Sequence, residues 1–144
     1  SHEQCIQTMR RIGAPREDIE QQFRRAVFNV VARNQDDHTK NIAFLMDKRG
    51  TWRLAPAFDM IFAHNPEGEW TGSHQMSVNG KRDGFELEDL LSFAEYASSR
   101  TRQAKNLIAE VEGAAGRWVE FAAEAGVGDE RSRAIGECFR RFLK

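Results

Sequence analysis

The sequence has few of the features that stabilise secreted domains or anchor membrane proteins. Its 144 residues include only two cysteines, Cys5 and Cys138, which are too few for a disulfide framework. We therefore expect two reduced thiols, with Cys138 in the core. No apolar run approaches the roughly 18 residues of a membrane span, and the N-terminus has no signal-peptide apolar stretch. These absences predict a cytoplasmic protein that makes no contact with a membrane.

The chain also lacks an excess of charge of either sign. It has 21 Lys and Arg residues against 22 Asp and Glu residues, and a formal net charge of -1. This balance argues against the basic surface that nucleic-acid binding requires, so we expect no direct nucleic-acid binding. A hydrophobic content of 40% and a charged content of 30% are ordinary for a globular protein, and the length suits one domain.

Apolar residues recur at helical spacing along most of the chain. The predicted helices cover residues 3–11, 15 to about 34, 86–97 and 101–125, and a last helix that Asp129 caps. Two short strand-like runs, 42–46 and 51–55, flank a turn in which Gly50 can take a positive φ. A further short strand is expected at 75–78. The predicted fold class is mainly α with a small β-hairpin.

Carboxylates and an amide cluster around the hairpin. Asp36 and Asn41 lie five residues apart in the segment before it, and Asp59 follows it. Phosphoryl transfer needs a carboxylate that orients or deprotonates the attacking hydroxyl, together with metal ligands that hold the nucleotide phosphates. Hard oxygen ligands of this kind suit Mg²⁺ better than zinc. The spacing therefore favours the metal and base part of a phosphoryl-transfer site.

The residues around this set have less specific interpretations. Asp37 should point away from Asp36, as a solvated charge or a brace for the loop. His38 could orient Asp36 or contact a nucleotide, and Lys40 could neutralise a transferring phosphate.

Two other interpretations compete with catalysis. The polar residues could be structural, with Asn34 as a helix C-cap, Asp36 and Asp37 as turn braces, and Asp59 as the N-cap of a helix beginning at Met60. An Asp-x-His pair also occurs in metal hydrolases, although such sites usually need further histidine ligands.

Three segments form one combined pattern: Asn34-x-Asp36-x-His38-x-Lys40-Asn41, the run from Ala55 to Met60, and the run from Met76 to Arg82. Together they resemble the C-terminal region of the HipA family. The family consists of bacterial serine/threonine kinases that act as toxins of type II toxin-antitoxin systems. The resemblance implies ATP and Mg²⁺ as cofactors, with Asp36 as the catalytic base and Asn41 and Asp59 as metal ligands. It also implies that the nucleotide site is lined by His38, Thr39, Lys40, Asn41, Phe58 and Asp59.

The resemblance also implies a particular organisation. Residues 1–144 would form a single helical C-lobe of a protein-kinase-like fold. The glycine-rich loop, the ATP-binding lysine and the hinge would belong to an N-terminal lobe, and none of them is found in this sequence. The chain alone should therefore bind nucleotide weakly and transfer phosphate poorly.

The expected partners are that N-terminal lobe, a HipB-like helix-turn-helix antitoxin, and a protein substrate, for which an aminoacyl-tRNA synthetase is one candidate. The alternative function is that of a catalytically inert helical interaction domain that binds an antitoxin or a partner lobe.

Overall fold

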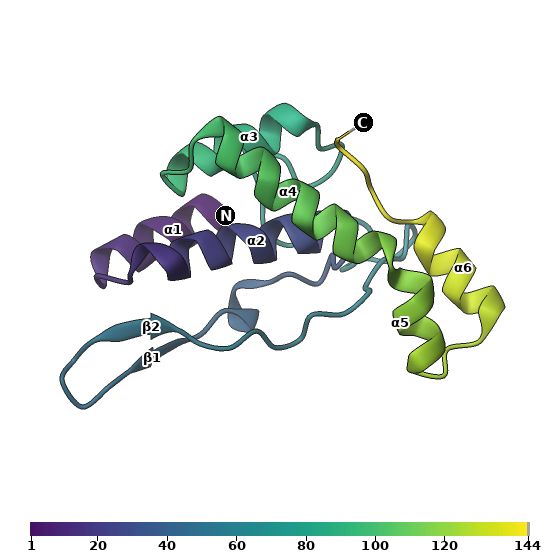
Figure 1. The fold of residues 1–144 in the computed structure, drawn as a ribbon, viewed down its shortest axis with the longest axis horizontal. Coiled ribbons are helices and arrows are strands. Elements are labelled where there is room, and N and C mark those ends of the chain that lie inside the picture. The colour runs from purple at the N-terminus through teal and green to yellow at the C-terminus, as the bar shows by residue number, and fades with distance from the viewer. Residues whose placement is uncertain (144) are drawn as a thin grey trace.

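Helices dominate the computed structural model, which describes residues 1–143 (Figure 1). The helices are α1 (His2–Arg11), α2 (Arg16–Val31), α3 (Leu87–Tyr96), α4 (Thr101–Gly116), α5 (Trp118–Glu124) and α6 (Asp129–Glu137). A short 3₁₀ turn, η1 (Thr39–Asn41), precedes the antiparallel strands β1 (Phe44–Met46) and β2 (Trp52–Leu54). The predicted fold class, mainly α with a small hairpin, is confirmed. No helix in this part of the chain is long and apolar enough to cross a membrane.

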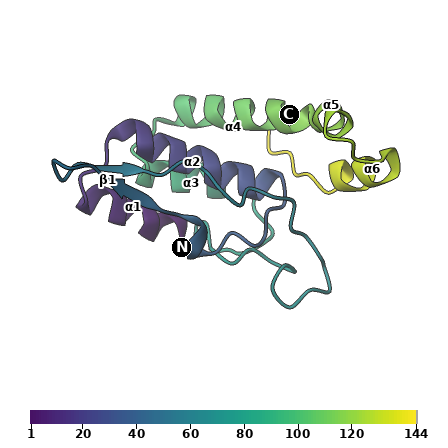
Figure 2. The ribbon, with the colours of Figure 1, turned by 90° about the horizontal axis from the view of Figure 1, so that it is seen from below.

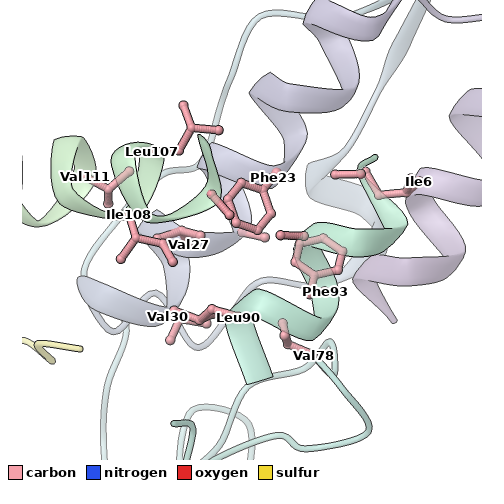
Figure 3. Close-up of a cluster of buried hydrophobic side chains, with 14 of the residues drawn as sticks. Ile6, Phe23, Val27, Val30, Val78, Leu90, Phe93, Leu107, Ile108 and Val111 are labelled. Carbon is pink, nitrogen blue, oxygen red and sulfur yellow. The ribbon is translucent and has the colours of Figure 1, made fainter. Parts of the chain in front are cut away.

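Helix α2 is the centre of the fold. Figure 2 shows α4 along one side of α2, with α1 and α3 along the other. Phe23 and Val27 of α2 are fully buried, and the ring of Phe23 lies 5.5 Å from that of Phe93 on α3. Ile108 of α4 and Ile6 of α1 complete this part of the core (Figure 3). Four helices therefore share one hydrophobic core, with α2 contacting all three others.

Helix α2 ends earlier than predicted. Ala32 is its C-cap, and Arg33 then takes a φ of 56°, which turns the chain away from the helix axis. The expected end near Asn34 is therefore too late by about one turn. This early turn directs the next eight residues, 34–41, away from the axis of α2.

The predicted helix 101–125 is two helices. Helix α4 ends at Gly116, and Arg117 joins it to α5 with a φ of -89° and a ψ of 11°. The break lets Trp118 turn towards α6, where its indole nitrogen donates to the carbonyl of Ser132 at 2.8 Å and its ring lies 5.8 Å from that of Phe139. Tertiary packing thus overrides a continuous helical pattern.

Three smaller predictions were also wrong. Gly128, rather than Asp129, is the N-cap of α6, and Asp129 is the first helical residue, where its charge still favours the helix dipole. Cys138 is only half-buried, although both cysteines are free as expected. Residues 75–78 form no strand, because only Val78 pairs, with Lys81 across a tight turn.

The hairpin is anchored to α2 by one carboxylate. Asp18 accepts two hydrogen bonds from the guanidinium of Arg53, at 2.9 and 2.8 Å, and a third from the backbone of Leu54 at 2.7 Å. The bond from Arg53 lowers the pKa of Asp18. Strands β1 and β2 are shorter than predicted, and the far end of the hairpin projects away from the helices (Figure 1).

Replacing Phe93 with Ala should lower the free energy of unfolding by about 3–5 kcal/mol, because its fully buried ring would leave a cavity between α2 and α3. Urea unfolding followed by circular dichroism measures this change. Phe121→Ala is the matched control, since that ring is 42% exposed, and it should cost far less. Equal costs for the two variants would contradict the described core.

Candidate active site

The segment 34–41 is held between two other loops. The backbone N–H of Gln35 donates to the carbonyl of Ala63 at 3.0 Å, and the N–H of Gln75 donates to the carbonyl of Gln35 at 3.2 Å. The side-chain amide of Asn34 donates to Asn29 Oδ1 at 3.1 Å and to the carbonyl of Asp59 at 3.2 Å. The interpretation of Asn34 as the C-cap of α2 is wrong, because Ala32 takes that position. Asn34 instead ties the backbone of Asp59 to the end of α2.

Asp36 and Asn41 are joined within the loop. The Asn41 amide nitrogen donates to the carbonyl of Asp36 at 3.1 Å, across the turn η1. This bond uses the nitrogen of Asn41 and leaves its Oδ1 as an acceptor or ligand. The Asp36 side chain is 39% exposed, and its Oδ1 lies 3.9 Å from His38 Nε2. The base candidate is thus accessible, with an imidazole beside it.

Asp59 comes close to this loop from the far side of the hairpin. Its backbone has a φ of 54°, and its residue is exposed. Asn41, His38 and Asp59 all line one cavity of about 20 Å³, which also includes Asn34. No helix begins at Met60, so the interpretation of Asp59 as an N-cap is wrong.

The cavity offers unpartnered polar atoms. Gln22 Oε1, Asn34 Oδ1 and Arg25 Nε are buried and have no hydrogen-bond partner among residues 1–143. Buried polar atoms without a partner commonly face a water or an ion. The oxygens among them, Gln22 Oε1 and Asn34 Oδ1, are with Asn41 Oδ1 and the Asp59 carboxylate of the kind that Mg²⁺ prefers, whereas Arg25 Nε is a cationic donor and cannot be a ligand.

The remaining predicted site residues lie at the surface. Thr39 and Lys40 are exposed, and the ring of Phe58 is 44% exposed. None of the three lines the cavity. Residues 1–143 contain no cluster of three or more His, Cys, Asp or Glu side chains arranged to hold a metal ion.

Asp37 follows the exposed Asp36 in the sequence but is itself buried. Its side chain is 1% exposed, and its Oδ2 lies 2.9 Å from His74 Nδ1 and 3.2 Å from His2 Nε2. Its Oδ1 accepts the backbone N–H groups of Gln75 at 2.8 Å and Met76 at 3.2 Å. Asp37 is therefore a brace, as one interpretation held, and is not a solvated charge.

The same contacts keep Asp37 ionised. Burial alone would raise the pKa of its carboxyl, but the hydrogen bonds from His2 and His74 outweigh burial and hold that pKa well below its usual range. No local sequence pattern predicts these partners, because they lie 35 and 37 residues away along the chain.

The comparisons with known proteins identify a family for most of the chain. Residues 1–119 match the family model described as "HipA-like C-terminal domain". The chain belongs to this family. The matched HipA-like residues include the whole of the loop 34–41, the hairpin, Asp59 and His74.

One curated relative is also similar to this HipA-like domain. It is a protein of Sinorhizobium fredii (strain NBRC 101917 / NGR234) described as "Putative kinase Y4mE", 36% identical over 58 residues. The match covers 40% of this chain and only 14% of the relative, so the chain spans a small part of that protein's length. No solved structure matches the chain significantly.

Replacing Asp37 with Asn should lower the free energy of unfolding by about 3–5 kcal/mol at neutral pH, since it leaves buried donors without their charge partner. The pKa of Asp37 is depressed in the folded state. Its stabilisation is therefore present above the ordinary Asp pKa of about 3.9, and is lost as the pH falls from there towards the folded value.

The difference between the wild type and Asp37→Asn should accordingly shrink below about pH 4. Urea unfolding across a pH series measures it. Asp36→Asn, one residue away and exposed, should change stability by less than about 0.5 kcal/mol. A loss for Asp37→Asn no larger than that for Asp36→Asn would show that Asp37 is no brace.

Proposed function

We propose that this HipA-like domain carries the metal and base part of an ATP- and Mg²⁺-dependent serine/threonine protein kinase of a type II toxin-antitoxin system. The observation that carries the proposal is the link that Asn41 makes between the other two residues, Asp36 and Asp59. Asn41 is bonded to the backbone of Asp36, and Asn41 and Asp59 line one cavity although the hairpin separates them in sequence.

Asp36 is the proposed catalytic base. Its carboxylate is accessible, so the hydroxyl of a serine or threonine could approach and give up its proton to Oδ1 or Oδ2. His38, 3.9 Å away, adds an electrostatic influence on the same carboxylate. Because Asn41 fixes the backbone of Asp36, the base and the metal ligand keep the same position relative to one another.

Asn41 and Asp59 are the proposed ligands of Mg²⁺. Asn41 would offer Oδ1, since its nitrogen is already bonded, and Asp59 would offer a carboxylate oxygen. When bound there with ATP, the metal neutralises charge on the transferring phosphoryl group. Thr39, Lys40 and Phe58 do not line the cavity but are exposed, so they would be available to contact a nucleotide.

The remaining parts of the reaction lie beyond these residues. The proposed kinase takes its glycine-rich loop and ATP-binding lysine from an N-terminal lobe, phosphorylates a protein such as an aminoacyl-tRNA synthetase, and is restrained by a HipB-like antitoxin. The chain alone would then transfer phosphate poorly, because bound ATP would lack half of its contacts.

A second candidate function is that of an inert interaction domain. An apolar cavity of about 250 Å³ opens between α2, α4 and α5. Its lining includes the partly exposed apolar residues Ile61 and Phe121, and this exposure favours a surface that binds a partner. Such a surface suits an antitoxin or a partner lobe, and it is compatible with a kinase as well. Phosphotransfer by the full-length protein separates the two functions.

In the full-length protein, Asp36→Asn should reduce phosphotransfer by on the order of 10²–10⁴-fold, because the general base is lost. Transfer of ³²P from ATP to protein measures the rate, and circular dichroism checks that the variant is folded. Asp129→Asn, an exposed change on α6, is the matched control. Wild-type activity in Asp36→Asn would remove Asp36 as the base, whereas an absence of phosphotransfer in the wild-type protein itself would favour the inert interaction domain.

Asp59→Asn should raise the Mg²⁺ concentration needed for half-maximal phosphotransfer by at least about 10-fold, because a charged ligand is lost. A Mg²⁺ titration at fixed ATP measures this. Asp36→Asn is the matched contrast, since its residual rate should keep the wild-type Mg²⁺ requirement. An unchanged requirement in Asp59→Asn would remove Asp59 from the metal site.

A further inference from the structure

The segment after α6 returns to the end of α2. The backbone N–H of Arg140 donates to the carbonyl of Val31 at 2.9 Å, and its Nη1 donates to the carbonyl of Val30 at 3.0 Å. These are among the last carbonyls of α2, which have no partner within the helix, and a cation there also favours the helix dipole. Arg140 is therefore fixed at the point where the loop 34–41 begins. It lies outside the residues that match the family model.

Arg140 also contacts His74, the residue that bonds to the brace Asp37. Its Nη1 lies 3.1 Å from Nε2 of His74, whose side chain is fully buried. Its Nη2 pairs with Asp83, and its guanidinium lies over the ring of Phe85, 5.3 Å from the ring centroid. These contacts fix the guanidinium in one orientation against the imidazole.

This contact defines which ring nitrogen of His74 carries the proton. A guanidinium has only donors, so Nε2 of His74 must accept the hydrogen bond with its lone pair. The ring proton then resides on Nδ1, which donates to Asp37 Oδ2 at 2.9 Å. The hydrogen bonds thus run in one direction, from Arg140 through His74 to Asp37.

We propose that Arg140 is a positioning residue for phosphotransfer, acting through His74 and Asp37 on the loop that carries Asp36 and Asn41. The inference rests on the proposed kinase function. Asp37 is the immediate neighbour of the base, and its two oxygens accept bonds from two separate segments, the start of α1 and residues 74–76. Arg140 sets which nitrogen of His74 can donate to that carboxylate, so a residue of the C-terminal segment helps to fix the base.

The first test needs no substitution. The ¹⁵N chemical shifts of the His74 ring in the 144-residue chain, near neutral pH, report which nitrogen carries the proton. We expect a neutral ring with the proton on Nδ1. A proton on Nε2, or on both nitrogens, would overturn the proposal, because Arg140 could not then donate to this ring.

The second test compares Arg140→Ala with Arg141→Ala, an exposed neighbour in the same segment. By hydrogen exchange, the amides of residues 36–41 should exchange about 10-fold faster in Arg140→Ala than in Arg141→Ala, while those of α1 keep their rates. In the full-length protein, kcat should fall about 10-fold with KM for ATP changed less than about 2-fold. Arg140→Lys, which restores a cation but only one donor centre, should recover part of the kcat.

A merely structural role for Arg140 would speed exchange throughout the helices and leave the kcat of the folded protein unchanged. That result, or equal behaviour of Arg140→Ala and Arg141→Ala, would overturn the proposal while the kinase function stands. If the wild-type protein transfers no phosphate, the proposed function fails instead. The ring shifts and the exchange of residues 36–41 then still decide whether Arg140 holds the loop.

Discussion

The structure around the candidate site depends on one buried carboxylate. Asp37 accepts hydrogen bonds from the first helix through His2, from the loop after the hairpin through His74, and from the backbone of Gln75 and Met76. A charge in the protein interior is tolerated only when several donors compensate for the lost water. Each of these segments must therefore be in place at once, which joins distant parts of the chain around residues 34–41.

This constraint gives two adjacent aspartates opposite roles. Asp37 faces inwards and is saturated with donors, whereas Asp36 faces outwards with 39% of its side chain exposed. The inward residue fixes the backbone and the outward residue keeps its carboxylate available. Asn34 and Asn41 extend the same arrangement, because Asn34 fixes the backbone of Asp59 and Asn41 fixes that of Asp36. The loop is thus preorganised by side chains that bond to backbone, a condition that catalysis by positioning requires.

The local patterns of the sequence were enough to predict most of the helices. The helices around Phe23 and Phe93 follow apolar periodicity, and the hairpin follows two short apolar runs with a glycine turn. The break at Arg117 could not be predicted, because the reason for it is the packing of Trp118 on α6. The spacing of Asp36, Asn41 and Asp59 pointed to a shared site, and Asn41 and Asp59 do line one cavity. The bracing role of Asp37 could be predicted only as one of two alternatives. Its partners, His2 and His74, lie far from it in the sequence, and no local pattern connects them.

We propose that this braced loop brings Asn41 and Asp59 to one metal ion beside the carboxylate of Asp36. A crystal structure of the full-length protein with Mn²⁺ in place of Mg²⁺ and a non-hydrolysable ATP analogue tests it directly, because anomalous scattering locates the manganese. We expect an ion within about 2.0–2.4 Å of both Asn41 Oδ1 and an Asp59 carboxylate oxygen, with Asp36 nearby but not coordinating. An ion bound without Asn41 and Asp59, in a loop otherwise unchanged, would contradict it.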